Sequence, residues 1–329
     1  MTAIPAVQTS NLTKAYGDFV AVNGIDLTVE AGETFGFLGP NGAGKSTTIG
    51  MLCTLVTPTS GTALVAGYDI VRQRDEVRRN LGLVFQDPTL DGYLTAERNL
   101  RLHAELYGVP RVGLDDRIRQ MLDMVGLWDR REWKVAMFSG GMKRRLEIAR
   151  GLLHSPRVLF LDEPTVGLDP QTRSSIWSYI RELKQAEDST IFLTTHYMDE
   201  AEYCDRIAIM DHGDIIALGT PEELKAQVGK DTVVIHTADD DAAIAELASQ
   251  FGVEAIRSEG AVRFAVEGGE QFIPRLFAAS TIAIKAVNVS RPTLDDVFMS
   301  YTGRTIRDAE STTAQRGREH MMMFRGGRR

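Results

Sequence analysis

The stretch "TFGFLGPNGAGKSTTIG", residues 34–50, decides the fold of this chain. Its centre, "GPNGAGKST" at 39–47, has the spacing G-x-x-x-x-G-K-[ST], with an apolar run before it and a helical pattern after it. Glycines let backbone amides curl around a phosphate, a lysine supplies a point charge to its outer oxygens, and a following hydroxyl ligates Mg²⁺. The stretch therefore predicts a phosphate-binding loop between a β-strand and a helix that continues to about residue 56.

The residues of this loop that we expect to bind a nucleotide are Gly39, Asn41, Gly42, Gly44, Lys45, Ser46 and Thr47. Lys45 is expected to act on the β- and γ-phosphates during catalysis, and the Ser46 hydroxyl is expected to be a metal ligand. A glycine turn in a sheet protein without nucleotide is the simpler alternative, but it leaves the lysine, serine and threonine unexplained.

A second motif, "VLFLDEP" at 158–164, places two acids at the end of another apolar run. Asp162 is expected to deliver its carboxylate to the metal, and Glu163 to polarise a water toward the γ-phosphate as a general base. Taken alone, the pair could be two solvated acids at a strand exit. Beside the phosphate loop, it predicts hydrolysis of a nucleoside triphosphate.

The apolar runs predict an α/β fold. Four runs are nearly all apolar, as strands buried on both faces of a parallel sheet must be, and they are residues 34–39, 81–85, 157–162 and 190–196. Residues 18–30 and 206–219 each have the pattern strand, turn, strand, which predicts antiparallel additions to the parallel core. Residues 95–155 show helical patterns without a convincing strand, which predicts a helical subdomain.

The composition changes after the turn "GTPEEL" at 219–224, which opens a helix. Residues 231–290 alternate as βαββαβ, which fits a small α+β sandwich, and Thr293 and Asp296 have capping-box spacing for a short last helix. Residues 304–329 hold seven arginines against three acids and no core-forming pattern.

The predicted fold class is therefore α/β, a P-loop NTPase core with an antiparallel β-subdomain and a helical subdomain, followed by a small α+β (βαββαβ) C-terminal domain. We expect domains at 1–222, with the helical subdomain at about 87–155, and at 223–303, before a basic tail at 304–329.

Bulk properties limit the function classes. The 329 residues are 43% hydrophobic, enough for roughly two domains, and 37 basic against 45 acidic residues give a net charge of -8, which argues against binding nucleic acid through bulk charge. Two cysteines, Cys53 and Cys204, cannot form a disulfide framework, so a reducing cytoplasm fits best. No run approaches the ~20 apolar residues that cross a bilayer. We expect a protein that stays in the cytoplasm and does not itself span a membrane.

The stretch "MFSGGMKRRLEIARGLL", residues 137–153, raises a separate question. It predicts a helix whose three leading amides are free, which is an end that attracts an anion. The basic residues Lys143, Arg144 and Arg145 either make that helix start unusually positive or form an ordinary solvated face, and the sequence does not decide between the two.

Five motifs in order resemble those of the nucleotide-binding subunit of an ABC transporter, over residues 7–220. The resemblance implies that Tyr16 stacks on adenine, that Gln86 contacts Mg²⁺ and signals to a membrane partner, and that His196 reads the γ-phosphate. "FSGGM" matches the signature, with Ser139, Gly140 and Gly141, and "VGLDP" at 166–170 matches the loop with Asp169 that crosses to a second subunit. Taken singly, Tyr16, Gln86 and His196 also fit ordinary packing or surface positions.

The resemblance answers the question of the second anion site. In this family the signature of one subunit covers the γ-phosphate of ATP held by the other, so two subunits sandwich two nucleotides. It implies ATP and Mg²⁺ as cofactors, Ser46, Gln86 and Asp162 as the metal residues, and a second copy or a related ATPase as partner. Met142 departs from the family's usual glutamine, which removes one polar side-chain contact to the nucleotide.

Residues 86–108 resemble the exporter-type coupling region of this family, and the small C-terminal domain, with "RPTLDDVF" and "YTGR", resembles that of the daunorubicin-resistance ATPases. The resemblance implies a separate transmembrane permease subunit, a place at the cytoplasmic face of the membrane, and export of a hydrophobic or amphiphilic compound such as an antibiotic, drug or lipid. The basic tail is either a flexible end or an arm that touches anionic lipid or the partner.

Two other function classes fit less well. Soluble ATPases of this type that act on ribosomes or DNA usually carry two such units or a long coiled-coil insert, which this chain lacks, so we expect no nucleic acid partner. A kinase would use the phosphate loop but would leave the signature, residues 166–170 and His196 unexplained.

Overall fold

The structure is a computed structural model that describes residues 4–187, 189–258 and 260–303. The predicted basic tail, residues 304–329, lies outside the described residues. The described residues form two compact units, and the division lies between Gly219 and Thr220.

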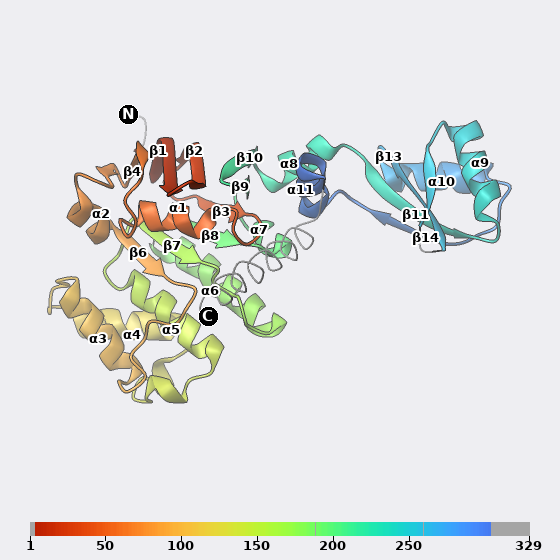
Figure 1. Ribbon diagram of the computed structural model, residues 1–329. Coiled ribbons are helices and arrows are strands. Elements are labelled where there is room, and N and C mark those ends of the chain that lie inside the picture. The colour runs from red at the N-terminus through yellow and green to blue at the C-terminus, as the bar shows by residue number, and fades with distance from the viewer. Residues whose placement is uncertain (1–3, 188, 259, 304–329) are drawn as a thin grey trace, which may run out of the picture. The chain divides into compact units, whose positions relative to one another are not determined.

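The first unit is built on a six-stranded sheet with the order β10-β9-β3-β8-β7-β6 (Figure 1). Its strands are β3 (Thr34–Leu38), β6 (Leu81–Val84), β7 (Val158–Asp162), β8 (Thr190–Thr195), β9 (Arg206–Asp211) and β10 (Asp214–Gly219). All pairs are parallel except that of β9 with β10. The four predicted core strands are confirmed. The predicted hairpin at 206–219 is confirmed too, but its first strand belongs to the parallel core and only β10 is an antiparallel addition.

A second sheet, with the order β2-β1-β4-β5, is wholly antiparallel. Its strands are β1 (Val7–Tyr16), β2 (Phe19–Val29), β4 (Ser60–Val65) and β5 (Tyr68–Asp69). The prediction of two strands within residues 18–30 is wrong, because these residues form the single strand β2. Gly24 has a φ of 62° and its amide donates to the Thr13 hydroxyl, where the register between β1 and β2 shifts. The glycine therefore accommodates a bulge and does not reverse the chain.

Between the two sheets lies α1 (Lys45–Leu52), the helix that follows the phosphate loop (Figure 1). Its buried face packs into a core that also contains aromatic rings from β3 and β8. Phe37 and Phe192 meet edge to face with ring centroids 5.1 Å apart, a favoured geometry for aromatic pairs. The helix ends at Leu52 and not near residue 56, because Thr54 takes a φ of 62°, which is outside the helical range.

As predicted, residues 95–155 contain helices and no strand of the sheets, and they come between β6 and β7 in the sequence (Figure 1). The helices of the first unit are α2 (Arg74–Asn80), α3 (Ala96–Leu106), α4 (Leu114–Met124), the short 3₁₀ turns η1 (Trp128–Arg130) and η2 (Val135–Met137), α5 (Gly140–Leu152), α6 (Pro170–Glu187) and α7 (Met198–Ala201). α5 approaches β6 closely, since a Cβ placed on Gly82 would lie 2.2 Å from the Gly151 carbonyl oxygen.

The second unit has the predicted βαββαβ order. After α8 (Pro221–Val228) come β11 (Asp231–Thr237), α9 (Asp240–Phe251), β12 (Ala255–Ser258), β13 (Ala261–Val266), α10 (Gly269–Ala279), β14 (Ile284–Ser290) and α11 (Leu294–Thr302). The strands form one antiparallel sheet with the order β12-β13-β11-β14, and a separate hydrophobic core joins it to α9 and α10. The predicted capping box of Thr293 and Asp296 is present at the start of α11.

In the part of the chain that the structure describes, no helix has the length and apolar character that crossing a membrane requires.

The close approach of α5 to β6 generates a stability prediction. Gly82→Ala should push α5 away from the sheet and lower the free energy of unfolding of the first unit by ~1–3 kcal/mol, the usual cost of overpacking. Urea unfolding followed by tryptophan fluorescence would measure this, because Trp128, Trp133 and Trp177 all lie in the first unit.

Gly92→Ala is the matched control, since a Cβ there would meet Ala136 only at ordinary contact distance, 3.7 Å. Equal unfolding midpoints for the two variants would contradict the prediction.

Candidate functional site

The phosphate loop runs from the end of β3 to the start of α1, and its glycines are required by close backbone contacts. A Cβ on Gly39 would lie 2.3 Å from the Met210 carbonyl oxygen, and one on Gly44 would lie 2.5 Å from the Ala21 carbonyl oxygen. Gly44 also caps α1 with a φ of 109° and contributes no side chain to the cap. The first turn of α1 is therefore left open for an anion, as a helix N-terminus without a side-chain cap can be.

Lys45 is only 4% exposed, and its ammonium lies inside the loop. The Nζ atom donates to the carbonyl oxygens of Gly39 at 2.7 Å and Pro40 at 3.1 Å. It also lies 3.7 Å from Oε1 of Glu163. The structure thus brings the loop lysine and the predicted base together.

The carboxylate of Asp162 lies at the carboxyl end of β7 and faces the start of α1. Its Oδ1 accepts hydrogen bonds from the Ser46 hydroxyl at 3.1 Å and from the Thr194 hydroxyl at 2.6 Å. Two of the three predicted metal residues, Ser46 and Asp162, are therefore neighbours although they are distant in sequence, and Thr194 fixes the orientation of the acid.

The donor set at this point suits a hard cation. Hydroxyl and carboxylate oxygens are the ligands that Mg²⁺ prefers, usually together with water and substrate phosphates. The described part of the chain contains no group of three or more His, Cys, Asp or Glu side chains that could hold a metal ion. Ser46 and Asp162 therefore fit Mg²⁺ as part of a shell that the nucleotide completes.

Glu163 occupies the centre of the site. It has a φ of 46°, which is uncommon for a residue with a side chain and is typical of strained functional positions. Its amide donates to the Thr194 hydroxyl at 3.0 Å. Its carboxylate accepts from Gln86 Nε2 at 3.2 Å and lies 3.4 Å from His196 Nδ1. That bond uses the side-chain nitrogen of Gln86, so the side-chain oxygen of Gln86, Oε1, is the atom left for a cation.

The pKa of Glu163 reflects two opposed effects. Burial favours the neutral acid and is the largest influence, but the His196 ring, 3.4 Å from the carboxylate, and the charge of Lys45 outweigh it, so the pKa is lowered. The carboxylate is therefore ionised at neutral pH, which is the state a general base needs.

Tyr16 lies at the end of β1, half exposed. The ammonium of Lys14 is 4.8 Å from the centroid of its ring. Tyr16 pairs with Phe19 across the hairpin whose second strand contacts the phosphate loop at Ala21. The ring is thus on the edge next to the loop, and Asn41, Gly42 and Thr47 of that loop are at least partly exposed.

The signature residues form a second group at the start of α5. Ser139 is the N-cap, and its hydroxyl accepts from the Met142 amide at 3.3 Å. The capped amide is that of Met142, which follows the three leading residues of the signature. The atoms nearest to a Cβ placed on Gly140 or Gly141 belong to Leu168 and Thr172, at the start of α6. Asp169 caps that helix by accepting from the Thr172 amide and hydroxyl, which lower its pKa.

Met142 is buried, and its sulfur lies 3.4 Å from Arg130 Nη1. Its side chain contributes to packing under the signature. Of the basic residues that follow, Arg144 does not lie on a solvated face, because its side chain is buried against backbone carbonyls. Arg145 is partly buried and donates to the Val125 carbonyl and the Tyr179 hydroxyl.

Two parts of the site were not predicted from the sequence. Thr194 is a polar residue in an apolar run that is buried throughout, and that contrast is the signal that could have found it. Glu200 is 1% exposed and accepts from the hydroxyls of Thr165, after β7, and Thr195, before His196. Glu200 therefore ties together the two chain segments that carry Glu163 and His196.

Comparison with known proteins agrees with this geometry. The family model "ABC transporter" matches residues 22–166, and the model "ATP-binding protein DrrA1-3-like, C-terminal domain" matches residues 219–302. The linearmycin resistance ATP-binding protein LnrL of Bacillus subtilis is 39% identical, over 92% of this chain and 100% of its own length. The chain belongs to the ABC transporter ATP-binding proteins.

As a member of this family, the chain is an ATPase subunit that binds ATP. The daunorubicin/doxorubicin resistance ATP-binding protein DrrA of Streptomyces peucetius is also 39% identical, over 94% of this chain and 96% of its own length. A dimeric ATP-binding cassette in a post-hydrolysis state, bound to ADP and Pi, matches with a TM-score of 0.59 and 29% identity, over 65% of this chain and 98% of that one.

The lowered pKa of Glu163 predicts a pH window for stability. In the unfolded chain the carboxyl titrates near 4.5, whereas in the folded protein it binds its proton only at lower pH. The ionised group therefore stabilises the fold above pH 4.5, and this contribution is lost as the pH falls through the folded pKa. The difference in thermal midpoint between wild type and Glu163→Gln should be constant near neutral pH and change below pH 4.5 in the direction that disfavours wild type.

Calorimetry at a series of pH values checks this. In a His196→Ala background the change should begin at higher pH, because the neighbouring ring that lowers the Glu163 pKa is gone. A difference that is independent of pH through the acid range would contradict the assignment.

Proposed function

We propose that this chain is the ATP-hydrolysing subunit of an exporter. Two copies, or this chain and a related ATPase, close around two Mg-ATP and drive a separate transmembrane subunit that exports a hydrophobic or amphiphilic compound, such as an antibiotic, a drug or a lipid. The chain works at the cytoplasmic face of the membrane, held there by that subunit.

The proposed dimer rests on one observation. The chain has a phosphate loop beside Glu163 and, separately, a helix N-terminus at Ser139 that packs against the start of α6. A helix N-terminus attracts anions through its amides and dipole, a direct effect of ~0.3–2 kcal/mol. If each such end serves the nucleotide on another subunit, ATP links the two, and the dimeric cassette relative supports this arrangement.

The chemistry follows from the groups around Glu163. Bound Mg²⁺ would neutralise charge on the β- and γ-phosphates. Lys45 stabilises the same charge, and Gln86 and His196 hold the Glu163 carboxylate in place. Glu163 accepts a proton from the attacking water. The oxygen of that water bonds to the γ-phosphorus while the bond between this phosphorus and the bridging oxygen of the leaving ADP breaks.

The dimer generates a test with two variants. Glu163→Gln should bind Mg-ATP, form a stable dimer in size-exclusion chromatography with light scattering, and hydrolyse ATP at least ~100-fold more slowly, since a positioned base contributes about 10²- to 10⁴-fold. Adding Ser139→Arg to this variant should abolish the dimer, because the large side chain occupies the space for the phosphate, and should leave ATP binding by the monomer unchanged.

Ser139→Ala in the same background is the control, since it removes only the cap of α5. A dimer that survives Ser139→Arg would overturn the proposed geometry, and wild-type turnover by Glu163→Gln would overturn the role of the base.

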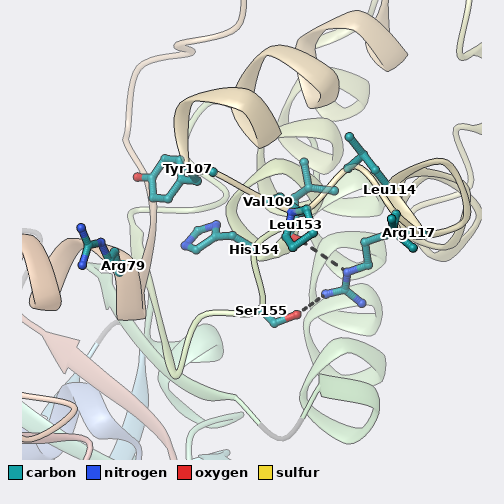
Figure 2. Close-up of a pocket in the computed structure, with 12 residues that line it drawn as sticks. Arg79, Tyr107, Val109, Leu114, Arg117, Leu153, His154 and Ser155 are labelled. Carbon is teal, nitrogen blue, oxygen red and sulfur yellow. Dashed lines mark hydrogen bonds between the residues drawn. The ribbon is translucent and has the colours of Figure 1, made fainter.

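The permease partner is supported by a pocket in the helical part of the first unit, shown in Figure 2. It has a volume of about 450 Å³ and lies between α2, the segment from α3 to α4, and the end of α5. Tyr107 stacks on His154 with centroids 4.2 Å apart, and Arg117 donates to the Leu153 carbonyl and the Ser155 hydroxyl at the pocket wall. It contains none of the predicted nucleotide residues.

Exposed apolar side chains lie at this pocket. Val112 lines it and is 93% exposed, and Leu106, which precedes the lining residue Tyr107, is 75% exposed. Side chains exposed to this degree gain most from burial against a partner. We therefore place the cytoplasmic segment of the permease at this pocket.

This placement predicts that Val112→Glu weakens co-purification from detergent with the permease subunit. The new charge would have to be buried at the interface, whereas in the free protein the position is exposed, so ATP binding and thermal stability should not change. Leu55→Glu, at a 56% exposed position outside the helical part, is the control. Equal recovery of the permease with both variants would contradict the placement.

A further inference from the structure

Arg144 is a charged residue in the middle of the sequence of α5 and is only 6% exposed. Its donors are met by backbone oxygens from two strand ends. Nε donates to the Pro164 carbonyl at 2.6 Å, and Nη2 donates to the Asp162 and Glu163 carbonyls at 3.0 and 3.1 Å. Nη1 donates to the Phe85 carbonyl.

The carbonyls that Arg144 contacts belong to the residues that set the site. The carbonyls of Asp162, Glu163 and Pro164 belong to the backbone turn in which Glu163 has its positive φ. The carbonyl of Phe85 immediately precedes Gln86 in the chain. A strained backbone persists only where its surroundings hold it. One guanidinium therefore holds the backbone behind both Glu163 and Gln86, whose side chains meet at 3.2 Å.

The neighbouring charges on α5 extend the same attachment. Glu147, 1% exposed, lies 3.4 Å from Arg144 and accepts from the Thr89 amide at 2.7 Å. Arg150 donates to the Thr89 carbonyl at 3.1 Å. One face of α5 thus holds the segment from Phe85 to Thr89, and Arg144 alone of these three also reaches the end of β7.

We propose that Arg144 is a positioning residue for ATP hydrolysis, which holds the Glu163 backbone in its strained conformation and keeps Glu163 and Gln86 in register. The inference rests on the proposed role of Glu163 as the base. The printed partners of Arg144 are backbone carbonyls at two strand ends and Glu147, and none of them belongs to the phosphate loop. Arg144 therefore acts on the rate of the chemical step and not on nucleotide affinity.

Lysine is the informative replacement. It keeps the positive charge beside Glu147 but has a single nitrogen, which cannot serve four carbonyls from two strands as the planar guanidinium does. Arg144→Lys should lower kcat by at least about 10-fold, since small misplacements of a catalytic group can cost about 10²-fold. The Kd for Mg-ATP should stay within about 3-fold of wild type, a span of less than 1 kcal/mol.

Arg145→Lys is the matched control. Arg145 is the next residue of the same helix, and it too donates hydrogen bonds from a partly buried position. Its partners are the Val125 carbonyl and the Tyr179 hydroxyl, and neither residue belongs to the nucleotide site or lies next to one that does in the sequence. It should lower thermal stability to a degree similar to Arg144→Lys and keep kcat within about 3-fold, less than 1 kcal/mol in the barrier. Equal kcat for the two variants, or a parallel loss of kcat and affinity in both, would overturn the positioning role.

Combination with Glu163→Gln separates the inference from the proposed function. If Arg144 acts through Glu163, adding Arg144→Lys to Glu163→Gln should change the residual hydrolysis rate less than 2-fold, because interacting residues are not additive. A further 10-fold loss would show that Arg144 acts elsewhere. Wild-type hydrolysis by Glu163→Gln alone would defeat the proposed base, whereas loss with Glu163→Gln and none with Arg144→Lys would defeat only the positioning role.

Discussion

The buried charge of Glu163 constrains the arrangement of the whole nucleotide site. Burial alone would favour the protonated acid, which cannot accept a proton from water. Lys45 reaches the carboxylate from the loop after β3, Gln86 from the segment after β6, and His196 from the segment after β8. These groups can converge because parallel strands present their carboxyl ends at one edge of the sheet. The edge-to-face pair of Phe37 and Phe192, between β3 and β8, packs the strands that support them.

The site could be predicted from the sequence wherever a reactive residue ends an apolar run. Asp162 ends the buried strand β7, Glu163 follows it, and Lys45 follows β3 through a glycine-rich loop, so strand ends and residue chemistry predicted these three. His196 follows β8, and its role was implied by the family resemblance. The alternation of apolar runs with helical patterns predicted the α/β fold and the βαββαβ order of the second unit.

Other features have no such pattern. The strand β2 carries a glycine where its pairing with β1 is irregular, and a glycine there marks either a turn or a bulge. The partners of Arg144 are backbone carbonyls, which any residue type provides, so no spacing of side chains could reveal them. From the sequence, a basic residue in a helix is therefore expected on a solvated face or near a bound anion. The structure instead buries Arg144 against backbone carbonyls.

α5 (Gly140–Leu152) links three points that the proposed exporter needs. Its first turn carries the signature, Arg144 reaches the strand end with Glu163, and its last carbonyls accept from Arg117 at the pocket in Figure 2. Thirteen residues span about 20 Å, and the intervening side chains of Leu146, Ile148 and Ala149 are buried. A packed helix resists compression and transmits displacement along its length. In that exporter, a movement of the permease at the pocket would reach both the catalytic acid of this subunit and the anion-binding end that faces the other one, along this single helix.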